Sequence, residues 1–111
     1  MEIVERKVGD VVILDLHGRI LSGEGERALR EAVDRIAGSG AVNLLINFAD
    51  VRYVDSSIVG EIVRALTTVS RTGGKLRLLS LPPAIRGLLS MTRLLTVLET
   101  SDSEDEALRS L

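Results

Sequence analysis

Residues 41–60 read AVNLLINFADVRYVDSSIVG and contain the clearest indication of the fold. The first eight residues are nearly continuous in apolar side chains, which is typical of a strand covered on both faces. The polar segment 49–57 follows, and apolar residues then recur at helical spacing. A buried strand that leads directly into an amphipathic helix is the repeating unit of α/β proteins. The apolar face of this predicted helix comprises Val59, Ile62, Val63, Leu66 and Val69.

The N-terminal part predicts a hairpin followed by a helix. Residues 2–8 and 11–16 are short runs rich in β-branched side chains, and the turn signal Gly9-Asp10 separates them. A polar, glycine-bearing connection at 17–26 leads to a helix that ends at residues 38–40. The apolar positions of that helix are Ala28, Leu29, Ala32, Val33, Ile36 and Ala37.

The C-terminal part repeats the alternation of strand and helix. Gly73-Gly74 ends the helix that follows the DSS segment, and residues 75–81 form the next predicted strand. Pro82-Pro83 opens a third helix, because proline is tolerated in a first turn, where the missing N–H has no intrahelical partner. Residues 95–100 predict a last short strand. Ser103 and Glu106 then form a capping-box pattern ahead of a terminal helix. The apolar face of the third helix comprises Ala84, Ile85, Leu88 and Leu89.

These elements predict the order ββαβαβαβα within one α/β domain that spans residues 1–111. Strands that alternate with helices require right-handed crossovers and therefore a mostly parallel sheet. The first strand of the hairpin pairs antiparallel at one side, so the sheet is mixed.

The composition argues against several classes of function. The chain has 111 residues, 45% of them hydrophobic, no cysteine and a net charge of −2. No secretory signal and no membrane-spanning run is visible, so we expect a soluble cytoplasmic protein without membrane insertion. Phe48 and Tyr53 are the two aromatic residues. Because basic and acidic residues are interspersed and aromatics are scarce, direct binding of nucleic acid has little support.

Three motifs that could indicate catalysis or cofactor binding lack the residues that such a function requires. We therefore expect neither a cofactor nor catalysis. Residues 23–28 match the dinucleotide spacing G-x-G-x-x-A, but Glu24 and Glu26 lie where a pyrophosphate needs positive potential. A phospho-accepting role for Asp55 lacks the acidic partners that Mg²⁺ requires. A triad of Ser56, His17 and Asp15 or Asp55 has no supporting spacing or nucleophile elbow.

The segment Asp55-Ser56-Ser57 has two possible roles. Aspartate and serine are favoured N-caps, because their oxygens accept hydrogen bonds from the unpaired N–H groups of a first helical turn. The same helix terminus offers free N–H groups and positive potential, which can accommodate a phosphate on a serine. One serine could therefore cap the helix while the other stays exposed as a phosphate acceptor.

A family resemblance favours the second role. "INFADVRYVDSS" followed by a helix, "GGKLRLLSL" and "LLSMTRLLTVLETSDSEDEAL" together resemble the anti-sigma factor antagonists, which belong to the sulphate-transporter and anti-sigma-antagonist (STAS) domain family. The resemblance covers almost the whole chain. It implies that Ser56, directly after Asp55, is phosphorylated by a partner kinase, which is itself the anti-sigma factor or a related switch kinase. Many members also carry an aspartate in the loop after the second strand, where this chain reads "ILSGEGE".

The resemblance also implies a partner-binding surface and a switch. An anti-sigma factor or serine-protein kinase would bind the unphosphorylated protein, and a serine phosphatase would reset it. The protein itself is expected to be a monomer or a weak dimer. Where the family usually has glycine after D-S-S, this chain has Ile58, which either crowds a kinase or adds an apolar contact. The alternative is a permanent structural subunit of a signalling scaffold or a lipid-transport complex. The partner-binding residues implied are Tyr53, Asp55, Ser56, Ser57, Ile58 and Glu61, with Ser56 exposed at the helix start.

Overall fold

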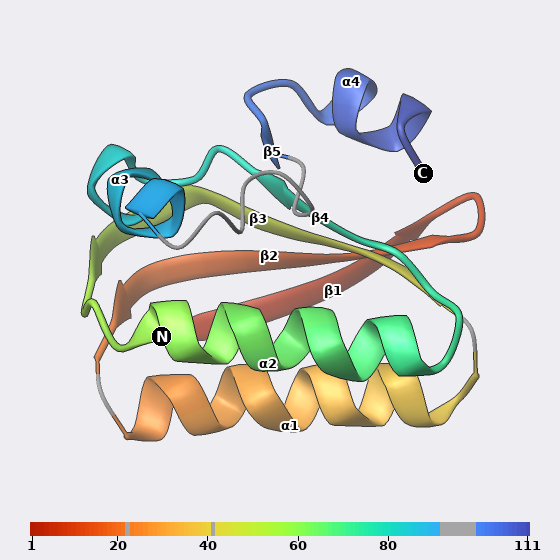
Figure 1. Ribbon diagram of the computed structural model, residues 1–111, viewed down its shortest axis with the longest axis horizontal. Coiled ribbons are helices and arrows are strands. Elements are labelled where there is room, and N and C mark those ends of the chain that lie inside the picture. The colour runs from red at the N-terminus through yellow and green to blue at the C-terminus, as the bar shows by residue number, and fades with distance from the viewer. Residues whose placement is uncertain (22, 41, 92–99) are drawn as a thin grey trace.

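The computed structural model of the protein describes residues 1–21, 23–40, 42–91 and 100–111 (Figure 1). Within these ranges the elements follow the predicted order ββαβαβαβα. Residues 95–99 of the predicted last strand lie outside the described residues. The elements are β1 (Glu2–Val8), β2 (Val11–Ile20), α1 (Glu24–Gly38), β3 (Asn43–Val54), α2 (Ile58–Arg71), β4 (Leu76–Leu79), α3 (Pro83–Met91), β5 (Thr100–Ser101) and α4 (Glu104–Arg109).

The five strands form one mixed sheet in the order β1-β2-β3-β4-β5. The hairpin prediction is confirmed, because β1 pairs antiparallel with β2 across a turn in which Gly9 has a φ of 60°. The remaining neighbours pair in parallel. Each parallel connection passes through a helix, as the alternating sequence pattern requires.

Two hydrophobic clusters lie on opposite faces of the sheet. Helices α1 and α2 run side by side along one face, and α4 lies on the other side (Figure 1). The larger cluster packs between the sheet and the helices α1, α2 and α3, and includes Leu14, Ile46 and Phe48. The smaller cluster lies between the sheet and α4, and includes Leu45 and Ala107. Strand β3 is therefore covered on both faces, as its continuous apolar run predicts.

Strands β2 and β3 extend beyond their apolar runs. The segments 17–20 and 49–54 were expected to be connections, but they pair with each other in parallel as far as Ile20 and Val54. Register shifts after Asp15 and after Gly18 interrupt this pairing. Neither segment continues the unbroken apolar run that precedes it, and the pairing of their backbone groups extends both strands.

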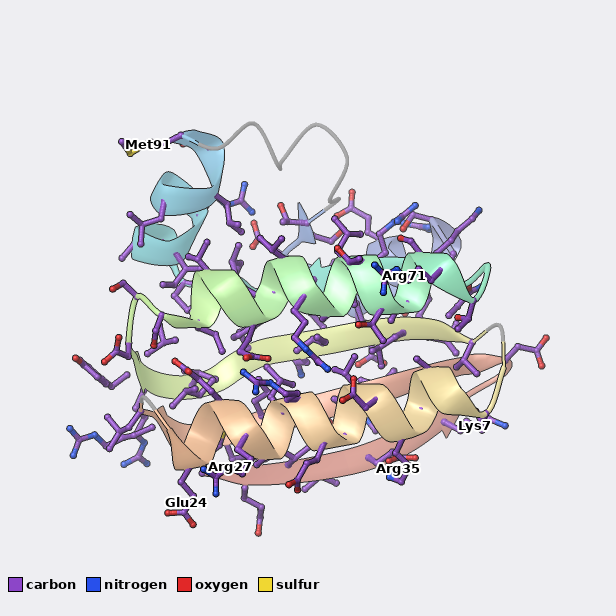
Figure 2. All side chains as sticks on the ribbon, turned by 60° about the horizontal axis from the view of Figure 1, so that its bottom comes forward. Lys7, Glu24, Arg27, Arg35, Arg71 and Met91 are labelled. Carbon is purple, nitrogen blue, oxygen red and sulfur yellow. The ribbon has the colours of Figure 1, made fainter. Side chains whose placement is uncertain are left out.

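The buried stripe of α2 is rotated relative to the predicted one. Ile62 and Val69 are buried as expected, but Val63 and Leu66 are half-buried. Helix α2 is flanked by α1 on one side and α3 on the other, so residues at its sides are shielded in part (Figure 2). The buried residues are Ile58, Glu61, Ile62, Ala65 and Val69.

Gly74 fits where no larger residue can. A Cβ atom at this position would lie 2.3 Å from the carbonyl oxygen of Val42 and 3.1 Å from Cγ1 of Val69. Because the closest atom is backbone, relief requires the chain itself to move. We expect Gly74→Ala to lower the free energy of unfolding by about 1–3 kcal/mol. Gly60→Ala is the matched control: it meets nothing within 4 Å inside α2 and should stabilise by roughly 0.5–1 kcal/mol. Equal melting temperatures for the two variants would contradict this packing.

Arg6 connects the sheet to α4. Its Nε donates to Asp15 Oδ2 at 2.6 Å, and its Nη1 donates to Glu104 Oε2 at 3.2 Å. Asn47 also donates to Asp15, with an Nδ2–Oδ1 distance of 2.8 Å. Burial alone would raise the pKa of Asp15, but the hydrogen bonds from Arg6 and Asn47 outweigh burial and lower it. The hydrogen bonds of Arg6 to Glu104 and, second, to Asp15 raise the pKa of Arg6.

This lowered pKa predicts a pH dependence of stability. A carboxylate whose pKa is lower in the folded state stabilises the protein above its unfolded-state pKa. That contribution disappears as the pH falls from the ordinary value of 3.8 through the folded-state value. We therefore expect Asp15→Asn to be less stable than the wild type at pH 7, and the difference to shrink below about pH 4. Urea unfolding of both proteins across this pH range measures the difference in stability. A difference that does not change with pH would contradict the lowered pKa of Asp15.

Candidate functional site

Ser56 lies in the turn between β3 and α2, and it is exposed. Its carbonyl oxygen accepts a hydrogen bond from Val59 N at 3.2 Å. Its hydroxyl makes no hydrogen bond to any residue in the described part of the chain. The predicted exposure of Ser56 at the helix start is therefore confirmed.

Asp55 organises this turn. Its backbone N–H donates to Ile20 O at 3.0 Å, which fixes the turn to the end of β2. Its Oδ1 accepts from Ser57 N at 3.1 Å, and its carbonyl oxygen accepts from Ile58 N at 3.0 Å. Ser57 occupies the N-cap position, but no side-chain capping bond comes from it. The side chain that stabilises the start of the helix is thus that of Asp55, rather than either serine.

The two serine hydroxyls have different surroundings. The Ser57 hydroxyl donates to the carboxylate of Glu26 in α1 and also lies 3.1 Å from Asp55 Oδ1. Since a hydroxyl has one proton to donate, the Ser57 proton is held between two carboxylates. Among the residues that the structure describes, none holds the Ser56 hydroxyl in this way, so the two neighbouring serines differ in their surroundings.

Ile58 and Glu61 do not form part of the exposed surface, which corrects their prediction as partner contacts. The Ile58 side chain is 0% exposed and belongs to the larger hydrophobic cluster. Because it points into the core, it neither crowds the neighbourhood of Ser56 nor offers an apolar contact. Glu61 is 6% exposed and accepts from Arg30 Nε of α1 at 3.0 Å. That hydrogen bond is the main cause of the raised pKa of Arg30.

Tyr53 is 49% exposed and remains available on the site surface. The guanidinium carbon of Arg19 lies 5.4 Å from the centroid of its ring, a distance suited to a cation–π interaction. These residues face each other because β2 and β3 pair in parallel beyond their apolar segments. Sequence reasoning missed Arg19, and it considered Glu26 as an obstacle to nucleotide binding and as an acidic residue that favours the helix N-terminus, but not as a contact of Ser57. The contact of Arg19 with Tyr53 depends on the register of β2 and β3, and the contact of Glu26 with Ser57 depends on the packing of α1 against α2.

Two residues of the rejected triad, Asp15 and His17, contact other side chains instead of Ser56. Asp15 is bound by Arg6, and His17 Nδ1 lies 3.2 Å from Asp50 Oδ2. Across residues 1–21, 23–40, 42–91 and 100–111, no cluster of three or more His, Asp or Glu residues could hold a metal ion. None of the helices in these ranges is long and apolar enough to cross a membrane.

The fold is that of a small α/β domain with a mixed sheet, and comparison with known sequences identifies its family. The chain belongs to the STAS domain family, which it matches over residues 2–107. A protein of Thermotoga neapolitana, described as an anti-sigma factor antagonist and a homolog of TM1081, is 32% identical over 105 residues. That alignment covers 94% of this chain and 92% of the relative.

Solved structures of similar proteins share the fold. The crystal structure of TM1081 from Thermotoga maritima, described as an anti-sigma factor antagonist, has a TM-score of 0.80 and 26% identity, covering 97% of this chain and 92% of that one. The phosphorylated form of the Bacillus protein SpoIIAA has a TM-score of 0.81 and 22% identity, with 98% of both chains covered. The second likeness shows the fold alone. Together these comparisons confirm the single mixed-sheet domain.

Proposed function

We propose that this protein is an anti-sigma factor antagonist that binds an anti-sigma factor while Ser56 is unphosphorylated. The observation that carries the proposal is the exposed hydroxyl of Ser56, which bonds to none of the described residues, beside the hydrogen-bonded hydroxyl of Ser57. The names of the Thermotoga relatives support the same role. Binding would keep the anti-sigma factor away from its sigma factor, and no catalysis by this chain is required.

Phosphorylation of Ser56 would act as the release signal. A phosphoserine adds about −1.5 to −2 charges at neutral pH. The described contacts place two carboxylates, those of Asp55 and Glu26, around the adjacent Ser57. These carboxylates would repel a phosphate on Ser56, while the N-terminus of α2 beside it would attract the phosphate. Burying it against a partner surface shaped for a hydroxyl is costly, so the complex would separate without any refolding. The phosphorylated SpoIIAA structure is consistent with such a modification on this fold.

The partner surface that we propose is smaller than the sequence suggests. Tyr53, Ser56 and Ser57 are exposed, and Asp55 is half-buried between them. Arg19 joins this set through its contact with Tyr53, and tyrosine and arginine are enriched in protein interfaces. The kinase is either the anti-sigma factor itself or a related serine-protein kinase, and a serine phosphatase would restore the binding form.

The proposal is tested by labelling the protein with candidate serine kinases from the same organism. Mass spectrometry should map the phosphate to Ser56, and the unlabelled protein alone should retain the anti-sigma factor in a pull-down. Absence of label with every candidate kinase, together with stable co-purification in a larger assembly, would favour the permanent-subunit alternative instead.

A further inference from the structure

Strand β1 forms one edge of the sheet and is paired along one side only in the described part of the chain. All seven of its residues, Glu2–Val8, pair with β2. The opposite side of β1 therefore presents a row of backbone N–H and C=O groups to any strand that approaches. An open edge of this length is a template for pairing with another chain.

The hairpin geometry determines which backbone groups face outward. The two-residue turn closes on the pair Val8 and Val11. In such a hairpin the closing pair exchanges both hydrogen bonds, and bonded and non-bonded pairs then alternate along the strand. The backbone groups of Ile3, Glu5 and Lys7 consequently point away from β2.

The side chains of β1 are self-complementary in one antiparallel register. We propose that a second copy of this chain pairs with β1 about a two-fold axis at Arg6. In that register Glu5 lies opposite Lys7 of the second copy, and the two form hydrogen-bonded pairs with opposite charges. Val4 and Val8, which are 42% and 39% exposed, lie opposite each other in non-bonded pairs, where side chains approach most closely.

Within the overlapping strand residues 4–8, the one like-charge contact in this register is compensated in each copy; beyond them, Glu2 would lie opposite Asp10 of the other copy's turn. Arg6 would lie opposite Arg6, but its guanidinium already bonds to Asp15 and Glu104 of its own chain. A single pair of short strands buries less surface than a standard stable interface, so the dimer is weak and depends on concentration. The Ser56 turn lies beyond the end of β3, away from this edge, and stays accessible in both copies. The dimer would therefore present two switch sites.

Charge reversal tests both the surface and the register. Sedimentation velocity over a hundredfold concentration range should show a reversible dimer for the wild type. Glu5→Lys and Lys7→Glu should each be monomeric, because like charges then face each other. An equimolar mixture of the two variants should regain the dimer, since each chain supplies one sign of charge. Lys7→Glu is the cleaner variant, because Glu5 also contacts Arg35 within its own chain.

The outcomes separate this inference from the proposed function. Lys7→Glu should melt like the wild type, whereas Glu5→Lys also loses its contact with Arg35. Both variants should accept phosphate on Ser56, because β2 lies between β1 and the strand that precedes that turn. A wild type that stays monomeric at all concentrations, or a mixture that fails to associate, overturns the pairing and leaves the switch untouched. A dimer that resists both substitutions places the interface elsewhere and also overturns it.

Discussion

Replacing Leu45 by alanine is expected to lower the free energy of unfolding by about 2–5 kcal/mol. Leu45 is 0% exposed in the middle of β3 and packs with Val11, Ile13 and Leu79 under α4. The substitution leaves a cavity between the sheet and a helix of only six residues, which cannot collapse far without losing its own contacts. Urea unfolding followed by circular dichroism measures the loss.

Leu21→Ala is the control for this prediction. Leu21 is 46% exposed just after β2, so its truncation should change stability by no more than about 0.5 kcal/mol. If Leu45→Ala melts at the wild-type temperature, the smaller cluster is not a packed core and α4 does not cover the sheet as described.

Ser56→Ala is expected to abolish phosphate incorporation while retaining binding of the anti-sigma factor. The substitution removes one exposed hydroxyl that has no hydrogen-bond partner in the described part of the chain, so the docking surface and the fold are nearly unchanged. Ser56→Asp should weaken the complex by less than phosphorylation does, because it adds one negative charge instead of nearly two. Kinase labelling with site mapping and a pull-down read out the two effects.

Ser57→Ala is the matched control for the acceptor assignment. It should still take up phosphate on Ser56, and it should lose about 0.5–1.5 kcal/mol of stability with its hydrogen bond to Glu26. Label on Ser56→Ala equal to that on the wild type would show that Ser56 is not the acceptor.

The order of elements was predictable from the sequence because local patterns determine it. Gly9-Asp10 marks the hairpin, and the Ser103–Glu106 capping pattern marks the start of α4, where Ser103 Oγ accepts from Glu106 N at 3.4 Å. The pairing of segments 17–20 and 49–54 was not predictable, since it depends on strand register rather than on local composition.

Within the site, the family resemblance implied Ser56 as the acceptor that we propose, but it did not give the surroundings of Ser56. The sequence places Ser56 directly after Asp55, between a predicted strand and a predicted helix. Ile58 was misplaced because a helix start can turn its first apolar residue toward either the core or solvent, and tertiary packing decides between them. Glu61 is a polar residue buried beside Arg30, and that contact exists only because α1 packs against α2.

A phosphate on Ser56 is proposed to turn off binding, and isothermal titration of the cognate anti-sigma factor measures this effect. Unphosphorylated protein and protein phosphorylated stoichiometrically on Ser56 are titrated under identical conditions. We expect the phosphorylated form to bind at least about tenfold more weakly, a loss of roughly 1.4 kcal/mol or more. Equal dissociation constants for the two forms would contradict the switch.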